Sequence, residues 1–400
     1  MARRGASTAA TAASSVLSVG AEGYRAGYDS SDWSGFATKH TIDPASGVLQ
    51  TPPLWDAGCL LTGGACPTGA PAAGAARSPA GRTILTSDGT PGTSKPFQWA
   101  SLSTAQQNKL NANPSTLAFT GTSGTVATYT SDGFGQQRVD YFRGVRTNET
   151  TPSPNFRKRG SVLGAVVNAQ PTFVSSPKAG WRSTWPAGSP ELASSITYQE
   201  FQANNAGRLQ VMYTAANDGM LHAFRGTDGF ELWGYVPNML IDNFRLTQYT
   251  RPTSNLISTM DSQPLEQDVF INGQWRTVLA GSMRLGGRGV YLIDVTNPNA
   301  PVPMWEFTNS PPAASPGTDC AAGARYCSHL GYTYDAVNIA RLSPSSTLGA
   351  NKWVALVSSG YFPTDTLDPA SNDPSAGQTS LLVIDLATGI YPEFSEVTEL

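Results

Sequence analysis

Histidine and cysteine are scarce in this chain, and their scarcity limits the metal chemistry that it can support. The 400 residues include only 3 His and 4 Cys. His40, His222 and His329 are dispersed, and no cysteine pair has the close spacing of a zinc knuckle. The sequence therefore does not indicate a zinc centre.

Charged residues are also few, at 14% of the chain against a usual ~25%. The formal net charge is -3. Nucleic-acid binding needs clustered Lys and Arg. The one basic cluster, Arg157-Lys158-Arg159, is small enough to be a solvated loop. We therefore expect no nucleic-acid partner.

Long hydrophobic runs are absent as well. No run approaches the ~18 apolar residues of a membrane span, and residues 1–20 lack the apolar core of a secretory signal. We expect no transmembrane segment and a disordered linker over residues 1–20. The chain is then either cytoplasmic or a mature or truncated piece of an exported protein.

Motifs of catalysis are missing too. The sequence has no Gly-x-Ser-x-Gly elbow, no His-Glu-x-x-His and no phosphate-binding loop. Asn217 and Asp218 precede Gly219 as ordinary turn formers, and His222 is interpreted as a satisfied sheet residue. We therefore expect no enzymatic activity.

Glycine and proline, in contrast, are abundant, with 40 Gly and 29 Pro. Many turns and few charged helix faces are typical of an all-β protein. One short helix is predicted near residues 102–113, where Ser103 or Thr104 can cap it.

The most informative segment is QVMYTAANDGMLHAFRGTDGFELWGYVP, residues 210–237. Its alternating runs and two Asp-Gly turns predict a three-stranded meander. Similar meanders begin at Trp275 and Trp353, and a fainter one opens the chain. A further short segment precedes each clear copy, so each unit supplies four strands, as in a propeller blade.

This repetition predicts a β-propeller of four-stranded antiparallel blades in residues 21–400, of the quinoprotein-like or WD40-like kind. The clear copies are spaced more widely than the roughly 40 to 50 residues of compact repeats, so the blades carry long loops. About four blades are recognisable, which implies an incomplete ring and a fragment of a longer protein. We place them near residues 21–60, 160–240, 260–310 and 330–400, with an insertion at 60–160.

The cysteines form two pairs, Cys59 with Cys66 and Cys320 with Cys327, each separated by seven residues. Both pairs lie in Gly- and Pro-rich insertions. This pattern favours two local disulfides in an oxidising compartment. Four reduced surface thiols are the alternative.

A turn followed by an aromatic residue recurs in the meanders. The segment AFRGTDGFELW resembles the tryptophan-docking repeat of quinoprotein propellers, and Trp233, Trp305 and Tyr391 occupy the docking positions. These aromatics are expected to lock one blade to the next. The same likeness raises a rival function, a quinone-dependent dehydrogenase, but the adjacent cysteines common in that class are absent.

Two segments invite comparison with metal loops. The insertion YFPTDTLDPASNDPSAG contains Asp365, Asp368 and Asp373, whose oxygens suit calcium, although its prolines favour a plain solvated hairpin loop. Asp29, Ser31 and Asp32 resemble the metal loop of A domains but lack the helix that follows it.

Longer motifs carry a family resemblance. The segments DYFRGVRTNE, ANDGMLHAF, LGYTYDAVNIARL and SLLVIDLATG, in this order, resemble the C-terminal β-propeller domain of PilC/PilY-type type IV pilus proteins, which are biogenesis factors and tip adhesins. The resemblance runs from about Tyr24 to the end of the chain. The propeller fold itself does not require the segment DYFRGVRTNE. Its presence therefore argues against the third candidate function, a generic extracellular binding propeller.

The resemblance implies a non-enzymatic role in pilus biogenesis, control of retraction, twitching motility and surface adhesion. It implies export to the pilus tip, cell surface or outer membrane of a Gram-negative bacterium. Minor pilins and a host-cell or abiotic surface would be its partners. It also implies calcium in the full-length protein, with the calcium loop expected beyond Leu400.

Long loops are the candidate contact regions, or else variable insertions. They cover residues 61–95, 145–160, 175–200 and 309–330. In the motif DYFRGVRTNE, residues 140–149, Arg143 and Arg146 are expected to pair with Asp140 or Glu149.

Overall fold

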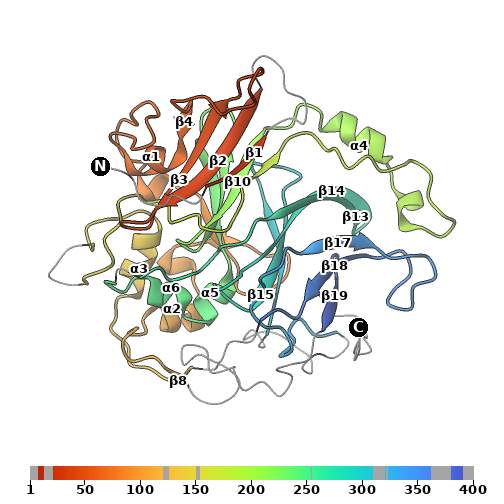
Figure 1. Cartoon of the computed structure of the whole chain (residues 1–400). Helices are drawn as coiled ribbons and strands as arrows, with labels where there is room; N and C mark the ends of the chain where they lie inside the picture. Colours follow the sequence, from red (N-terminus) through yellow and green to blue (C-terminus); the bar gives the residue numbers. More distant parts are fainter. Residues whose placement is uncertain are drawn as a thin grey trace.

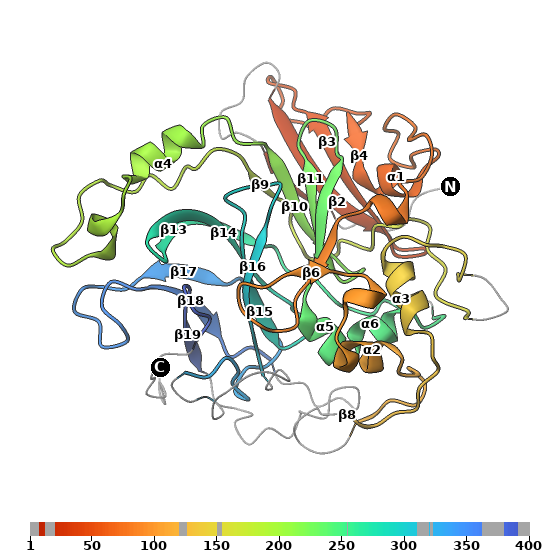
Figure 2. The same cartoon turned by 180° about the vertical axis from the view of Figure 1, so that it is seen from behind.

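The computed structural model describes residues 8–12, 21–119, 126–149, 154–253, 255–309, 320, 323–361 and 380–390. Four sheets follow one another along the chain (Figures 1 and 2). Strand β9 (Thr172–Val174) lies close to both β1 (Thr8–Ala12) and β13 (Leu265–Ile271), the first strands of the neighbouring sheets. The predicted β-propeller fold is confirmed.

The first sheet has the order β1-β2-β3-β4. After β1 its strands are β2 (Glu22–Asp29), β3 (Ser34–Thr41) and β4 (Trp55–Asp56). Strand β1 falls within residues 1–20, for which the sequence predicted a disordered linker. Its small residues give no hydrophobic signal, and it joins the sheet through backbone pairing with β2.

The second sheet contains the meander together with a part of the predicted insertion. Its order is β6-β5-β12-β11-β10-β9. The added strands are β10 (Val211–Ala216), β11 (Met220–Arg225), β12 (Glu231–Val236), β5 (Ile84–Thr86) and β6 (Lys95–Pro96). Strand β5 pairs in parallel with β12, so residues 60–160 are partly an extension of this sheet rather than only a loop.

The third and fourth sheets repeat the antiparallel pattern, and a small hairpin of β7 (Ala118–Phe119) and β8 (Val126–Thr128) stands apart from them. The third sheet comprises β13, β14 (Gln274–Ser282), β15 (Gly289–Asp294) and β16 (Val302–Thr308). The fourth comprises β17 (Asn338–Arg341), β18 (Trp353–Ser358) and β19 (Leu381–Asp385).

Both faces of the central strands are covered by protein. All six residues of β10 and of β15 are buried. The alternation read from the sequence therefore assigns side chains to one face or the other but does not separate buried from exposed residues, because neighbouring sheets cover both faces.

The predicted helix is present, but it is one of six α-helices in the described part of the chain. Helix α2 (Thr104–Leu110) begins after Ser103, whose side chain forms a capping box with Gln106. The others are α1 (Ala57–Thr62), α3 (Gly135–Phe142), α4 (Tyr198–Asn204), α5 (Asn238–Asp242) and α6 (Arg245–Tyr249), with 3-10 turns at Pro79–Gly81, Trp99–Ser101 and Pro190–Ala193. They are too short for a helical hydrophobic period to be visible in the sequence, so the expectation of one helix was wrong.

Two of the predicted docking tryptophans connect consecutive sheets through the same contact. The Trp233 indole, on β12, donates to the Pro298 carbonyl between β15 and β16 at 2.8 Å. The Trp305 indole, on β16, donates to the Leu386 carbonyl just after β19 at 2.9 Å. Tyr391, the third predicted residue, lies outside the described residues.

A third indole makes the same connection and was not predicted. Trp55, on β4, donates to the Gly226 carbonyl in the turn between β11 and β12 at 3.3 Å. A Cβ at Gly229, in the same turn, would lie 2.6 Å from the Trp55 ring, so the turn approaches the ring as closely as glycine allows. In all three cases the strand that comes last in the chain within one sheet contacts a turn of the next sheet.

We predict that Trp233→Phe lowers the free energy of unfolding by about 2 to 3 kcal/mol, because it removes a buried hydrogen bond and leaves a cavity. Trp185→Phe is the matched control, since Trp185 is only partly buried and its indole donates no hydrogen bond to the described residues. Urea denaturation of both variants measures the effect. Equal losses in the two variants would contradict the locking role.

Candidate functional site

A fully buried chain of charged groups crosses the second sheet. The Arg82 guanidinium donates to both Glu231 oxygens, at 2.7 and 2.8 Å. His222 Nδ1 lies 2.9 Å from Glu231 Oε1, and Nε2 lies 3.1 Å from Asp218 Oδ1. His222 is 0% exposed, and it lines neither of the two cavities described below. It is thus a satisfied residue of the sheet, as its position in the sequence indicated.

The two carboxylates determine the charge of this histidine. Burial alone would lower the pKa of His222, but Asp218 and Glu231 outweigh it and raise the pKa to about 9. Burial disfavours the Glu231 carboxylate as well, yet Arg82 and His222 hold its pKa well below the usual range. His222 is therefore a buried cation at neutral pH, with both ring nitrogens engaged.

Asn217 and Asp218 do more than form the turn that the sequence indicated. The Gly164 amide donates to Asp218 at 2.9 Å. The Asn217 amide group donates to Asp261 at 3.1 Å, and its oxygen accepts from the Thr259 amide at 3.0 Å. This turn consequently connects the second sheet to two loop segments. One contains Gly164 and precedes β9, and the other contains Thr259 and Asp261 and precedes β13.

The motif DYFRGVRTNE forms an ionic cluster around Glu149. Arg146 and Arg159 both lie within salt-bridge distance of Glu149, at 3.3 and 2.7 Å. Arg143 donates instead to carbonyl oxygens of Phe97 and Arg82. The expected pairing thus holds for Arg146, whereas Arg143 anchors backbone segments because its side chain points into the core.

The predicted contact loop 175–200 packs against the third and fourth sheets. Buried Asp268, on β13, accepts from the Lys178 amide and from the Tyr198 hydroxyl at 3.0 and 2.7 Å. Glu191 pairs with Arg341 on β17 at 2.7 Å and accepts from the Trp353 indole. In Figures 1 and 2 this segment and α4 extend outward beside β13 and β17. Residues 175–200 therefore connect the third and fourth sheets through buried side-chain contacts, and we call this segment the clasp loop.

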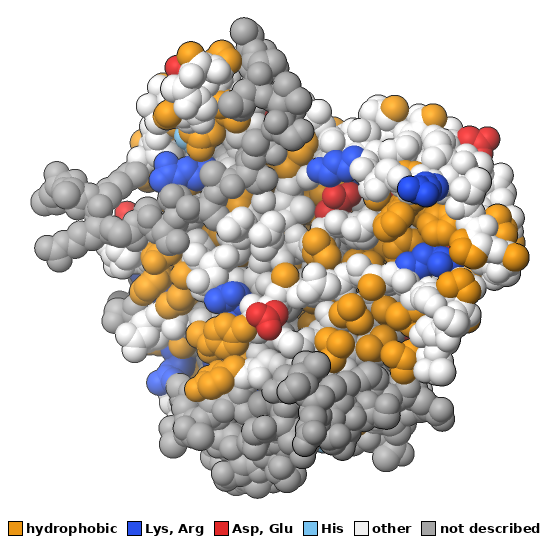
Figure 3. Space-filling view, turned by 45° about the vertical axis from the view of Figure 1, so that its right-hand side comes forward, with side chains coloured by type: hydrophobic (Ala, Val, Ile, Leu, Met, Phe, Trp, Pro, Cys, Tyr) orange, Lys and Arg blue, Asp and Glu red, His pale blue; other side chains and the backbone are white. Residues whose placement is uncertain are grey.

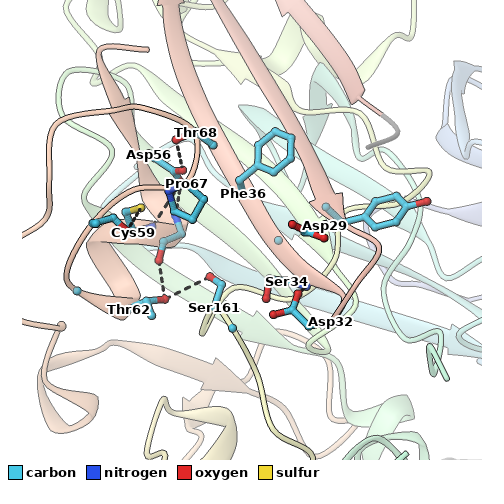
Figure 4. Close-up of a pocket in the computed structure, with 16 residues that line it drawn as sticks. Asp29, Asp32, Ser34, Phe36, Asp56, Cys59, Thr62, Pro67, Thr68 and Ser161 are labelled. Carbon is cyan, nitrogen blue, oxygen red and sulfur yellow. Dashed lines mark hydrogen bonds between the residues drawn. The ribbon is translucent and has the colours of Figure 1, made fainter. Parts of the chain in front are cut away.

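Two cavities flank the turn between β2 and β3. The first has a volume of about 210 Å³ and lies between this hairpin, the segment from Asp56 to Thr68, and Gly160-Ser161 (Figure 4). The second, of about 320 Å³, is lined by Asp32, Trp33 and Arg157 among others. Asp32 lines both cavities.

The face of the molecule in Figure 3 carries scattered charged side chains among larger hydrophobic areas.

No helix in the described ranges is long and apolar enough to cross a membrane. The metal candidates Asp365, Asp368 and Asp373 lie outside the described residues, so calcium binding by them stays a prediction.

Both cysteine pairs are close in the structure. The Cα atoms of Cys59 and Cys66 are 5.5 Å apart, and those of Cys320 and Cys327 are 4.3 Å apart, both arranged as disulfides. His329 lies beside the second pair, and the three ligand atoms are within 4.8 Å of one another. A disulfide occupies both sulfur atoms, so a metal would require the reduced protein.

The fold and these contacts can now be compared with known proteins. The family model of the PilY1 beta-propeller domain matches residues 163–394. The chain belongs to this family. The type IV pilus biogenesis factor PilY1 of Pseudomonas aeruginosa strain PAK is 31% identical over 92% of the chain. A PilY1 homolog of Xylella fastidiosa is 26% identical over 77% of it.

The relatives are much longer than this chain. It spans 26% of the length of the Pseudomonas factor and 21% of the Xylella homolog. The crystal structure of the Pseudomonas aeruginosa PilY1 C-terminal domain matches 56% of this chain and 37% of that one, at 28% identity and a TM-score of 0.38. The family model and the Pseudomonas relative confirm the family resemblance found in the sequence.

The charged chain predicts how stability depends on pH. The folded-state pKa of His222, about 9, exceeds its ordinary 6.5, so its contribution is complete below pH 6.5 and lost as pH rises through 9. Glu231 acts in the opposite direction and loses its contribution below its ordinary pKa of 4.5. Stability measured by urea denaturation should fall by on the order of 3 kcal/mol between pH 6.5 and 9 from His222. His222→Gln should remove this decline; an unchanged slope would contradict the assignment.

A second prediction is that both cysteine pairs form disulfides in the purified protein. Peptide mapping without reduction should recover Cys59 linked to Cys66 and Cys320 linked to Cys327, because each pair is adjacent in the fold. Denatured, unreduced protein should show no free thiols with a thiol reagent. Four reactive thiols in protein purified from an oxidising compartment would show that the alternative is correct.

Proposed function

We propose that this protein acts in type IV pilus biogenesis through its β-propeller. The observation that carries the proposal is the match to pilus biogenesis factors over 92% of the chain. The propeller itself supports the role, because sheets joined by buried indole and ionic contacts form a stiff body that can present loops to partners. The proposed partners are minor pilins at the pilus tip. The proposed processes are control of retraction, twitching motility and adhesion to host-cell or abiotic surfaces.

The proposed role is not enzymatic. His222 is a fully buried cation held between two carboxylates, so it is unavailable as a base. A quinone-dependent dehydrogenase would also need a funnel that holds a quinone and calcium. The first of the two cavities beside the β2–β3 turn, the one of about 210 Å³, is lined by carboxylates but by no basic side chain for the acidic groups of such a cofactor.

Calcium and location enter through the family resemblance alone. The described residues contain one group of metal-ligand side chains, Cys320, Cys327 and His329. These ligands suit soft metals rather than calcium, which prefers oxygen. Any calcium site of the full-length protein would therefore be built from other residues. Export to the pilus tip or cell surface agrees with the two predicted disulfides.

The test is a clean deletion of the gene in its host. Surface pili and twitching should be lost or strongly reduced and should return when the gene is supplied in trans, because a biogenesis factor is required for assembly. Shear preparations and stab-agar motility zones measure both. Normal pili in the deletion strain would refute the proposal, and quinone-dependent dye reduction by the purified protein would favour the enzyme.

A further inference from the structure

The first cavity beside the β2–β3 turn, between this hairpin and the segment from Asp56 to Thr68, carries acidic side chains and no basic ones. Its lining includes Asp29, Asp32 and Asp56, and no Lys, Arg or His. Close to the cavity in Figure 4, Asp32, Ser34 and Ser161 gather at one end. The charged side chains of this lining are therefore all acidic.

Two of these carboxylates, Asp56 and Asp32, differ in how many of their oxygens accept hydrogen bonds from the protein. Asp56 caps helix α1 through the Gly58 amide and accepts from the Thr68 hydroxyl, so both of its oxygens are occupied. Asp32 Oδ1 accepts from the Ser34 amide at 2.9 Å, whereas no described residue donates to Oδ2. Asp32 thus retains an acceptor oxygen for a ligand.

A second oxygen beside Asp32 is buried and lacks a partner. Ser34 Oγ makes no hydrogen bond within the described part of the chain. A Cβ on Gly160 would collide with both Ser34 Oγ and Asp32 Oδ2, so the two oxygens converge next to this glycine. An unpaired buried hydroxyl is costly, and a donor group placed here would satisfy it.

Part of the remaining wall is apolar. Tyr28, Phe36 and Pro67 line the cavity, and Figure 4 shows Phe36 facing the segment that contains Pro67. A volume of about 210 Å³ far exceeds what a bare ion needs and suits a side chain with an alkyl stem. Aromatic rings also attract cations, and the Arg25 guanidinium already lies 5.8 Å from the Phe36 ring.

We propose that this cavity binds a lysine or arginine side chain of a partner protein. The alkyl stem would lie against Tyr28 and Phe36, and the cationic head would donate to Asp32 Oδ2 and Ser34 Oγ. Charge complementarity argues for this occupant over an acidic or neutral one. The proposal adds a partner chemistry to the proposed pilus role, but its binding test does not depend on that role.

Neighbouring cations were considered as internal partners. Arg157 and Lys158 line the second cavity, on the other side of Asp32. The Arg157 guanidinium donates to the Asn255 carbonyl and lies over Tyr249. Neither cation forms an ion pair with Asp32 in the structure as described, so the carboxylate is left for an external group.

The test uses capped tripeptides, Gly-Lys-Gly, Gly-Arg-Gly and the neutral Gly-Gln-Gly, titrated into the purified chain and followed by saturation-transfer NMR. The basic peptides should bind more tightly than the glutamine peptide, and added salt should weaken them. Asp32→Asn should weaken the basic peptides by roughly fivefold. It preserves the fold because Asn keeps the oxygen that accepts from the Ser34 amide.

Asp43→Asn is the matched control. Asp43 also accepts backbone amides, in the exposed turn that follows β3 of the same sheet, with the Ala45 amide at 2.8 Å, but it does not line the cavity. Ser34→Ala is a second variant, expected to weaken binding without changing the charge. Equal binding of all three peptides, or equal effects of Asp32→Asn and Asp43→Asn, would overturn the proposal. Loss of pili on gene deletion, with no peptide binding, would leave the pilus role standing and reject this site alone.

Discussion

Successive sheets of this propeller hold one another through one repeated interaction, an indole N–H that donates to a turn carbonyl of the next sheet. Trp55, Trp233 and Trp305 each make it from the last strand of their sheet. The indole ring fills space between two sheets, and its one polar atom donates to a backbone carbonyl oxygen there. The same contact fixes both the spacing and the orientation of neighbouring sheets.

Ionic contacts supplement these indoles where segments distant in sequence meet. Arg82 reaches Glu231 from the insertion, and Glu191 reaches Arg341 from the clasp loop. Pairs removed from water stabilise a fold only when geometry and hydrogen bonds compensate for desolvation. Here each carboxylate accepts from more than one donor. An arrangement of the segments that separated the partners would leave a buried charge unpaired, which is costly. These contacts therefore disfavour other arrangements of the segments.

The cavity beside the β2–β3 turn depends on this arrangement. Its walls come from the first sheet, from α1 with the loop that follows it, and from Gly160-Ser161. The last segment is held on the hairpin by backbone contact, where the Gly35 amide donates to the Leu163 carbonyl at 2.9 Å. The site therefore forms only when three separate parts of the chain are in place.

The prediction of the fold from sequence rested on local chemistry. Asp-Gly turns, alternating strands and the Trp after each turn are determined by neighbours within a few residues, so the meanders and two docking tryptophans were readable. The short helices, strand β1 and the parallel pairing of β5 were not, because each is stabilised by distant partners and leaves little periodic signal.

The candidate site shows the same division. The sequence by itself determined the acidic residues Asp29 and Asp32 and the family to which the chain belongs. Only the tertiary structure decided that Asp32 and Ser34 converge beside Gly160, and that His222 carries a buried charge between Asp218 and Glu231. The physical reason is that the solvent exposure and charged neighbours of a side chain depend on how the chain folds around it, which brings segments as distant as Gly160 and Arg82 against Asp32 and Glu231.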